Sequence, residues 1–154
     1  MTINVNQKAP NFTLLDQNSN EIDLKNLKKK IILFFYPKDN TPGCTKEAIG
    51  FSNYKKKINN LGYEIYGISK DSIKKHNNFI DKQKLKIDLL TDENQKTCED
   101  YGVWVQKSMY GRKYFGIERT TFVINEKRII TKIWNKVKVN NHVEEVFDYL
   151  KDNC

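Results

Sequence analysis

The sequence predicts an α/β fold in which helices flank a central mixed β-sheet. The first apolar run, residues 31–36, shows no alternation of apolar and polar residues, which is typical of a central strand covered on both faces. Helical and strand patterns then alternate along the chain. Residues 120–124 and 128–134 predict a late pair of strands joined at Asn125-Glu126. Alternating strands and helices followed by such a pair indicate a layered fold with a mixed sheet.

The first helix and the strand after it follow from local patterns. Pro37 ends the first apolar run, and an amphipathic helix is predicted from Cys44 to Leu61-Gly62. Residues 63–69 predict the next strand. The apolar face of the helix recurs at three- and four-residue spacing and consists of Ala48, Phe51, Tyr54 and Ile58.

The second half of the chain continues the alternation. Asp71 or Ser72 can cap a helix that runs toward Lys84, and residues 87–90 predict a short strand. Asp92 can cap a further helix that reaches Tyr101. A last amphipathic helix has an apolar face of Val143, Val146, Phe147 and Leu150.

Size and composition predict one folded domain, residues 1–154. A chain of 154 residues buries about 70% of the surface that its unfolded form exposes, so a core can form. The composition is 38% hydrophobic, 30% charged and 12% aromatic, which is ordinary for a globular protein and argues against disorder. Linkers, repeats and low-complexity segments are absent from the sequence.

The formal net charge of +8 does not by itself indicate a nucleic-acid partner. The lysines are spread along the chain, and the tightest groups, residues 28–30 and 55–57, are not interleaved with aromatic residues as a single-strand binding surface requires. No secretory signal precedes residue 7, and residues 31–36 are too few to span a bilayer. We therefore expect a cytoplasmic protein that binds neither nucleic acid nor membrane.

Three cysteines, Cys44, Cys98 and Cys154, form neither a disulfide framework nor a C-x-x-C pair. Most free cysteines are small buried apolar residues. Cys44 differs because it is predicted to lie in the first turn of a helix, directly after a buried strand. Unpaired N–H groups and the helix dipole favour the thiolate there, and the thiolate is the nucleophilic form.

The loop before Cys44 supplies the groups that such a nucleophile requires. Pro42 stiffens the turn, Gly43 allows the backbone to approach closely, and Thr41 offers a hydroxyl. The spacing Pro37-x-x-x-Thr41-x-x-Cys44 resembles the active-site signature of the peroxiredoxin family. The longer match over residues 35–45 resembles its bacterioferritin comigratory protein (PrxQ) branch, as do residues 8–14, 101–104 and 116–124 in the same order.

The resemblance implies a thioredoxin-like fold and a peroxidase. Cys44 is then the peroxidatic cysteine, Thr41 hydrogen-bonds the peroxide, Pro37 shields the site, and Arg119 is the active-site arginine that Glu47 orients. The implied substrates are hydrogen peroxide and organic hydroperoxides. The implied reductant is a thiol such as thioredoxin, glutaredoxin or glutathione. No cofactor or metal is implied, and the protein is expected to be a monomer or a homodimer.

The physical roles can be argued beside the resemblance. Peroxide reduction moves charge from sulfur to oxygen, and a guanidinium at Arg119 can stabilise the thiolate and then share charge with the oxygens. Without the resemblance, the sequence would indicate an ordinary surface arginine at Arg119, at the start of a strand. Glu47 would then be a negative charge that interacts favourably with the start of a helix.

Other chemistries lack their motifs. His76 and His142 lie in lysine- and asparagine-rich helical stretches, and we expect both to be surface residues rather than bases for acyl transfer. Paired Cys/His spacings for zinc and glycine-rich nucleotide loops do not occur. Glu47 occupies the fourth position of what would be a C-x-x-C motif, which excludes a thioredoxin-type disulfide exchanger.

The sequence departs from the branch at its resolving cysteine. Ile49 stands five residues after Cys44, where many members carry that cysteine, and residues 78–82 contain none either. Cys98 is expected to be buried and structural, and Cys154, the final residue, is the remaining possible resolving thiol. We expect one-Cys recycling by an external thiol. The alternative is a catalytically idle thioredoxin-fold interaction module with a basic surface.

Overall fold

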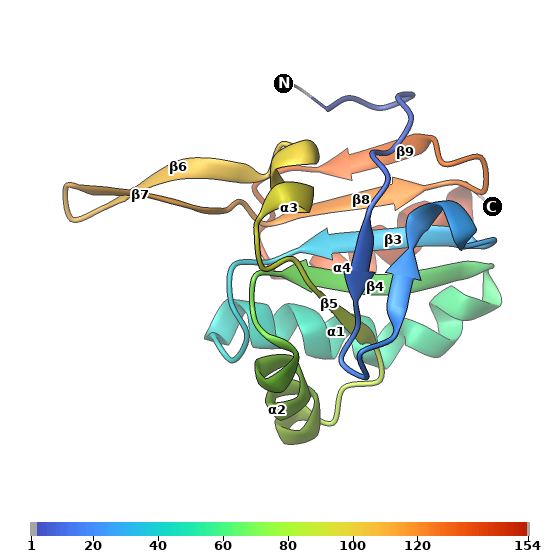
Figure 1. Cartoon of the computed structure of the whole chain (residues 1–154). Coiled ribbons are helices and arrows are strands. Elements are labelled where there is room, and N and C mark those ends of the chain that lie inside the picture. Colours follow the sequence, from blue (N-terminus) through green and yellow to red (C-terminus); the bar gives the residue numbers. More distant parts are fainter. Residues whose placement is uncertain (1–2, 154) are drawn as a thin grey trace.

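The computed structural model describes residues 3–153 and contains a seven-stranded mixed sheet with helices on its faces (Figure 1). The strand order is β2-β1-β5-β4-β3-β8-β9. In chain order the elements are β1 (Thr13–Leu15), β2 (Glu21–Asp23), the 3-10 helix η1 (Leu24–Asn26), β3 (Lys30–Phe35), α1 (Pro42–Asn60), β4 (Tyr63–Ser69), α2 (Ile73–Gln83), β5 (Asp88–Thr91), α3 (Lys96–Asp100), β6 (Trp104–Met109), β7 (Arg112–Ile117), β8 (Thr120–Ile124), β9 (Ile130–Trp134) and α4 (His142–Asp152).

Strand β3 lies inside the sheet, as the unbroken apolar run predicts. It pairs in parallel with β4 and antiparallel with β8, so the sheet is mixed. Alternate residues of β3 enter two different cores. Ile32 and Phe34 pack with α1, α2 and α4 on one face, whereas Ile31, Leu33 and Phe35 pack beneath α3, η1 and the N-terminal segment on the other. Because both faces are covered, β3 needs no polar position after Lys30.

Helices α1 and α4 lie side by side and run in the same direction. Val143 of α4 packs so closely on Gly50 that a Cβ at residue 50 would lie 2.8 Å from a Val143 methyl group. One turn further along both helices, the rings of Tyr54 and Phe147 lie 5.3 Å apart. The C-terminal end of α4 therefore continues away from Cys44, toward the far end of α1.

The predicted helices and caps are confirmed with small changes. Ser72 caps α2 by accepting a hydrogen bond from the Lys75 backbone, whereas Asp71 makes other contacts. Helix α3 is shorter than predicted, since it begins only at Lys96. Asp92 lies before the helix, and its carboxylate accepts hydrogen bonds from the backbone N–H groups of Thr97 and Cys98 in the first turn. Within residues 3–153, no helix combines the length and the apolar composition that crossing a membrane requires.

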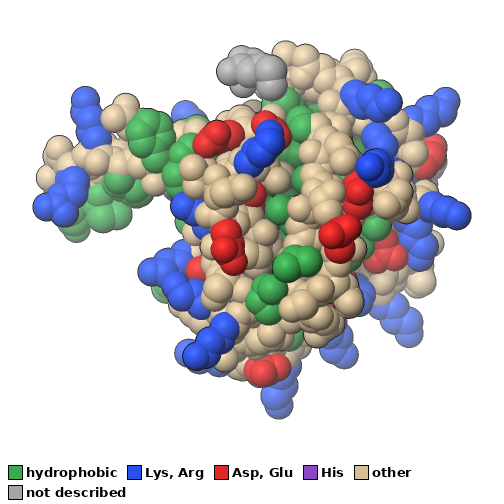
Figure 2. All heavy atoms as spheres, viewed as in Figure 1, with side chains coloured by type: hydrophobic (Ala, Val, Ile, Leu, Met, Phe, Trp, Pro, Cys, Tyr) green, Lys and Arg blue, Asp and Glu red, His purple; other side chains and the backbone are tan. Residues whose placement is uncertain are grey.

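The hairpin of β6 and β7 has no counterpart in the sequence prediction. It projects from the body of the molecule and forms a separate two-stranded sheet (Figure 1). Tyr110 and Gly111 turn the chain with φ values of 53° and 78°, which match the twist of a tight hairpin. Figure 2 shows hydrophobic and basic side chains on this projection. Without a buried face, the two strands lack the alternation by which strands are predicted.

Candidate active site

The first turn of α1 holds Cys44 beneath the surface. Pro42 occupies the first helical position, where a missing N–H costs nothing, and Thr41 precedes it with extended backbone. The Thr45 backbone N–H donates to the Thr41 carbonyl at 2.8 Å, which begins the helical hydrogen-bond pattern. Cys44 is only 1% exposed. Its sulfur is therefore held at the positive end of a 19-residue helix.

Arg119 reaches this sulfur from the short link between β7 and β8. One guanidinium nitrogen, Nη2, donates to Cys44 Sγ at 3.2 Å, and the other, Nη1, donates to Glu47 Oε1 at 2.7 Å. Cys44 and Glu47 lie three residues apart on one face of α1, so a single planar fork can serve both. The backbone of Arg119 is also held, because its carbonyl accepts from the Val137 N–H at 2.9 Å.

Burial and charge oppose each other at this site. Burial raises the pKa of Glu47 to about 7, although the charge and hydrogen bond of Arg119 act to lower it. Burial also acts against the charge on Arg119, but Glu47 and Cys44 outweigh it and raise the pKa of the guanidinium. The second oxygen of Glu47, Oε2, is buried without a hydrogen-bond partner. Glu47 is thus held beside Arg119 at an energetic cost.

Lys107 adds a second positive group from the hairpin. Its ammonium group donates to the carbonyl of Ile117 at the base of β7. Burial and the charge of Arg119 lower the pKa of Lys107, while Glu118 and Cys44 act to raise it. The sequence analysis did not single out Lys107, because its proximity to Cys44 depends on the unpredicted hairpin.

The remaining predicted site residues lie around the same turn. The Thr41 hydroxyl donates to the Lys38 carbonyl at 2.8 Å, so its lone pairs are left to accept a hydrogen bond. Gly43 lies under the guanidinium, and a Cβ there would be 3.2 Å from Arg119 Nη2. Pro37 is exposed on the loop that leads to α1. The structure thus brings Cys44 and Glu47 together with Arg119.

Comparisons with known proteins identify the family of the chain. The AhpC/TSA family model matches residues 5–133. The chain belongs to the AhpC/TSA family. It is 43% identical over 153 residues to peroxiredoxin Bcp of Bacillus subtilis. The alignment covers 99% of this chain and 98% of that relative.

Solved structures of PrxQ and bacterioferritin comigratory proteins are similar to this chain over nearly its whole length. A PrxQ variant of Xylella fastidiosa has a TM-score of 0.94 at 32% identity and covers 99% of this chain and 98% of its own. The bacterioferritin comigratory protein of Xanthomonas campestris, described for its alkyl peroxide reduction activity, has a TM-score of 0.87 at 34% identity and covers 92% and 91%.

The protein is therefore a peroxiredoxin with a thioredoxin-like fold, and it is a thiol-dependent peroxidase of the Bcp type. Peroxiredoxins act on peroxides and are reduced by thiol systems such as thioredoxin or glutathione. The idle interaction module is not favoured.

The expectation that both histidines lie on the surface is wrong. His76 is 0% exposed and His142 is 3% exposed. Burial lowers the pKa of His142 to about 4, and its ring contacts the Thr121 hydroxyl. The polar residues around each histidine in the sequence face solvent, whereas the histidine itself faces inward. Asp39, which contacts His76, was also missed, because nothing local marks a loop aspartate as buried.

The other cysteines differ from Cys44 in their surroundings. Cys98 is 0% exposed, as expected, and lies in the core on the opposite face of the sheet from Cys44. Burial, with the nearby charge of Asp92, raises the pKa of the Cys98 thiol far above its ordinary range. Ile49 packs against the core that contains Cys44. Cys154 lies outside the described residues.

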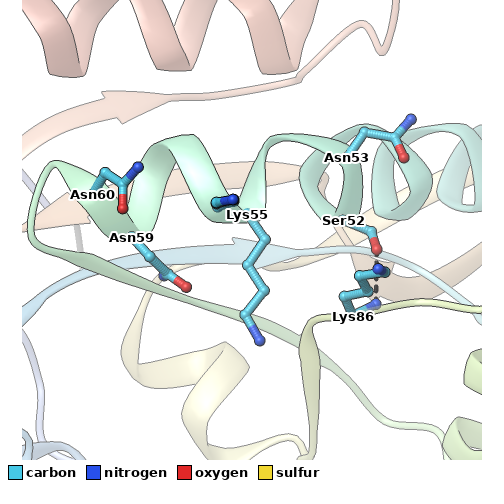
Figure 3. Close-up of a pocket in the computed structure, with 7 residues that line it drawn as sticks. Ser52, Asn53, Lys55, Asn59, Asn60 and Lys86 are labelled. Carbon is cyan, nitrogen blue, oxygen red and sulfur yellow. Dashed lines mark hydrogen bonds between the residues drawn. The ribbon is translucent and has the colours of Figure 1, made fainter.

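The hollow in Figure 3 is separate from this site. It has a volume of about 510 Å³ and follows the second half of α1, away from Cys44. Among residues 3–153, no cysteine or carboxylate lines it, and the single lining hydroxyl, on Ser52, accepts from the Lys86 backbone N–H. Its lining residues are Ser52, Asn53, Lys55, Lys56, Asn59, Asn60 and Lys86.

Proposed function

We propose that Cys44 is the peroxidatic cysteine and reduces hydrogen peroxide and organic hydroperoxides with Arg119 and Thr41 as its catalytic partners. The observation that carries the proposal is the 3.2 Å contact between Arg119 Nη2 and Cys44 Sγ. A fixed cation at this distance favours the thiolate, which is the form of the sulfur that attacks peroxide. The alkyl peroxide reduction described for the Xanthomonas relative supports organic hydroperoxides as substrates.

The reaction is a displacement at oxygen. The Cys44 thiolate forms an S–O bond with the terminal peroxide oxygen, the O–O bond breaks, and its electron pair leaves on the second oxygen. The attacked oxygen keeps its hydrogen, so Cys44 becomes the sulfenic acid, and a proton from solvent completes the leaving hydroxide or alkoxide as water or alcohol. Arg119 balances the sulfur charge before attack and the oxygen charge during it, without reorganising. Glu47 orients the guanidinium through its hydrogen bond to Nη1.

Thr41 positions the peroxide rather than balancing its charge. Its own hydrogen is committed to the Lys38 carbonyl, so the oxygen can accept the hydrogen of the peroxide O–H group. Holding that O–H fixes which oxygen faces the sulfur and keeps the leaving oxygen in line. Pro37, on the same loop, shields the sulfur from bulk solvent once the peroxide is bound.

Recycling of the sulfenic acid uses an external thiol, such as thioredoxin, glutaredoxin or glutathione. Cys98 is buried on the other face of the sheet and holds its proton, so it is a poor resolving thiol. Ile49 stands where a resolving cysteine is common in the branch, and its side chain has no thiol. The one-Cys mode is therefore favoured over an internal disulfide between residues of the described chain.

Mass spectrometry after one equivalent of hydrogen peroxide tests the proposal, because it identifies the reactive sulfur and its product together. We expect sulfenic acid on Cys44, and we expect Cys44→Ser to abolish turnover with dithiothreitol. Cys98→Ser should retain peroxidase activity and lose only some stability, since it changes a buried apolar site. Substantial turnover by Cys44→Ser would refute the assignment.

A further inference from the structure

His76 makes polar contacts inside the protein, and one of them is with the loop that leads to α1. It lies in the first half of α2 and is fully buried. Its Nδ1 lies 2.7 Å from Asp39 Oδ2, and its Nε2 lies 3.1 Å from the Leu90 carbonyl on β5. Asp39 itself is only 5% exposed. A histidine and an aspartate from distant parts of the chain thus meet in the interior.

The contacts give both ring nitrogens of His76 a polar partner. A carboxylate oxygen faces one nitrogen and a backbone carbonyl oxygen faces the other. The Tyr36 hydroxyl is also near Nδ1, at 3.5 Å, but it donates to Asp39 Oδ1 at 2.6 Å. The imidazole thus links the Asp39 carboxylate to the backbone of β5 across the interior. A buried pair of this kind is strongly disrupted when one partner is removed.

The pair holds the loop that presents the catalytic groups. Asp39 lies midway between Pro37 and Thr41. Its backbone N–H donates to Asp71 Oδ2 at 2.8 Å, so both its side chain and its backbone are anchored to the sheet and α2. The preceding carbonyl, that of Lys38, accepts the hydrogen of Thr41. Displacing Asp39 would therefore change the direction in which the Thr41 oxygen points.

We propose that Asp39 and His76 are a positioning pair that orients Thr41 and the first turn of α1 for attack on the peroxide. This proposal rests on the proposed function, because it assigns the pair a role in the reaction at Cys44. Neither residue touches the reacting atoms. The pair acts through the loop geometry, so it controls the reaction with an oriented peroxide more than the intrinsic reactivity of the sulfur.

Two reactions of the same sulfur separate positioning from stability. Hydrogen peroxide requires Thr41 and Arg119 in place, whereas alkylation by iodoacetamide requires only an accessible thiolate. We would measure both second-order rate constants at Cys44 for the wild-type protein, His76→Gln, Asp39→Asn and the double variant. We expect the peroxide constant to fall by about tenfold or more in each variant, because small misplacements are costly in catalysis. The alkylation constant should not fall with it.

The double variant and a matched control sharpen the comparison. If the residues act as one unit, the double variant should lose no more than the worse single variant. Phe79→Leu changes another fully buried side chain of α2, one that has no polar group to donate or accept a hydrogen bond. It should lower the melting temperature while keeping the wild-type ratio of peroxide to alkylation constants. If His76→Gln fails to fold, Asp39→Asn carries the same test.

The outcomes are distinct. A wild-type ratio in the folded His76→Gln or Asp39→Asn protein would overturn the positioning role. So would an equal fall of the ratio in Phe79→Leu, because the effect would then be general destabilisation. Wild-type protein that alkylates at Cys44 but does not react with peroxide would refute the proposed function itself, and the pair would lose its role with it.

Discussion

The guanidinium of Arg119 lies 3.2 Å from the sulfur of Cys44, although 75 positions separate the two residues in the chain. The contact depends on two separate pieces of the fold. The β3–α1 segment places the sulfur in the first turn of a helix, and the β7–β8 link carries the arginine over it. The same guanidinium donates to Glu47, so the direction of the fork is set from the helix that carries the nucleophile.

Arg119→Lys should slow the reaction with peroxide by roughly 100-fold, which corresponds to about 3 kcal/mol of barrier for the loss of one oriented donor. Lysine keeps the positive charge but cannot donate to Glu47 and the sulfur with one planar group. Stopped-flow mixing with hydrogen peroxide measures the change. Lys132→Arg is a control that alters a basic residue on β9. A lysine variant as fast as the wild type would show that charge alone is sufficient.

Glu47→Gln should change how stability depends on pH. Burial raises the pKa of Glu47 to about 7 in the folded protein, from the ordinary value of 4.5. The folded state therefore holds the Glu47 proton more tightly than the unfolded state does. The stability that this proton contributes is fully present below about pH 4.5 and is lost as the pH rises through about 7.

Urea unfolding of the wild type and Glu47→Gln at pH 5 and pH 8 tests this linkage. Relative to the variant, the wild type should lose stability on the order of 2 to 3 kcal/mol as the pH rises between these values. The same variant should react more slowly with peroxide at pH 8, because a neutral amide orients Arg119 less strongly than a carboxylate does. Parallel stability curves for the two proteins would contradict the raised pKa.

Thr41→Val should slow the reaction with peroxide by about tenfold to 100-fold while leaving the fold intact. Valine preserves the shape of the side chain and removes the oxygen that we propose accepts the peroxide hydrogen. Thr41→Ser keeps the hydroxyl and should retain most of the rate. Rapid-mixing kinetics at several peroxide concentrations provide the comparison. Equal rate constants for the valine and serine variants would remove Thr41 from the mechanism.

Gly43→Ala should separate stability from activity. An added Cβ would lie 3.2 Å from Arg119 Nη2, which is tight enough to displace the guanidinium. Alanine is a better helix former than glycine by up to about 1 kcal/mol, so thermal stability should not fall. The peroxide rate constant should fall by about tenfold. Gly116→Ala adds the same methyl group where the nearest atom is 3.5 Å away, and it should behave as wild type.

The core of the fold follows from local sequence patterns. Strand β4 has the predicted bounds, and Ser72 caps α2, because burial and capping leave clear patterns over a few residues. The sequence does not predict strands β1 and β2 or the β6–β7 hairpin. Strands β1 and β2 have only three residues each, and the hairpin lacks a buried face, so none of these segments shows a periodic pattern of apolar residues.

Some residues of the candidate site can be predicted from a local sequence pattern, and others cannot. Cys44, Thr41 and Gly43 are predicted together because they share one loop and one helical turn. The contact between Asp39 and His76 joins residues 37 positions apart, and no local pattern reports it. The polar residues around His76 in the sequence suggest that His76 is exposed, although in the structure only these neighbours on α2 face solvent and His76 is buried. Long-range polar contacts require the tertiary structure.

The direction of helix α4 bears on how the Cys44 sulfenic acid is resolved. Helix α4 runs parallel to α1, with Val143 beside Gly50 and Phe147 beside Tyr54. Ten residues of helix from Cys44 to Tyr54 span about 15 Å. The end of α4, at Asp152, continues in that direction. The described part of α4 therefore leads away from Cys44 rather than toward it.

Oxidation with one equivalent of peroxide should consequently leave Cys44 as a sulfenic acid that dimedone traps in high yield. Cys154→Ser should turn over at the wild-type rate with an external thiol, because that thiol resolves the intermediate. Non-reducing electrophoresis and peptide mapping measure the products. A stoichiometric Cys44–Cys154 disulfide within one chain would overturn the one-Cys mode. The same disulfide between two chains would instead assign the resolving thiol to a second subunit, and the one-Cys mode would fail for that reason.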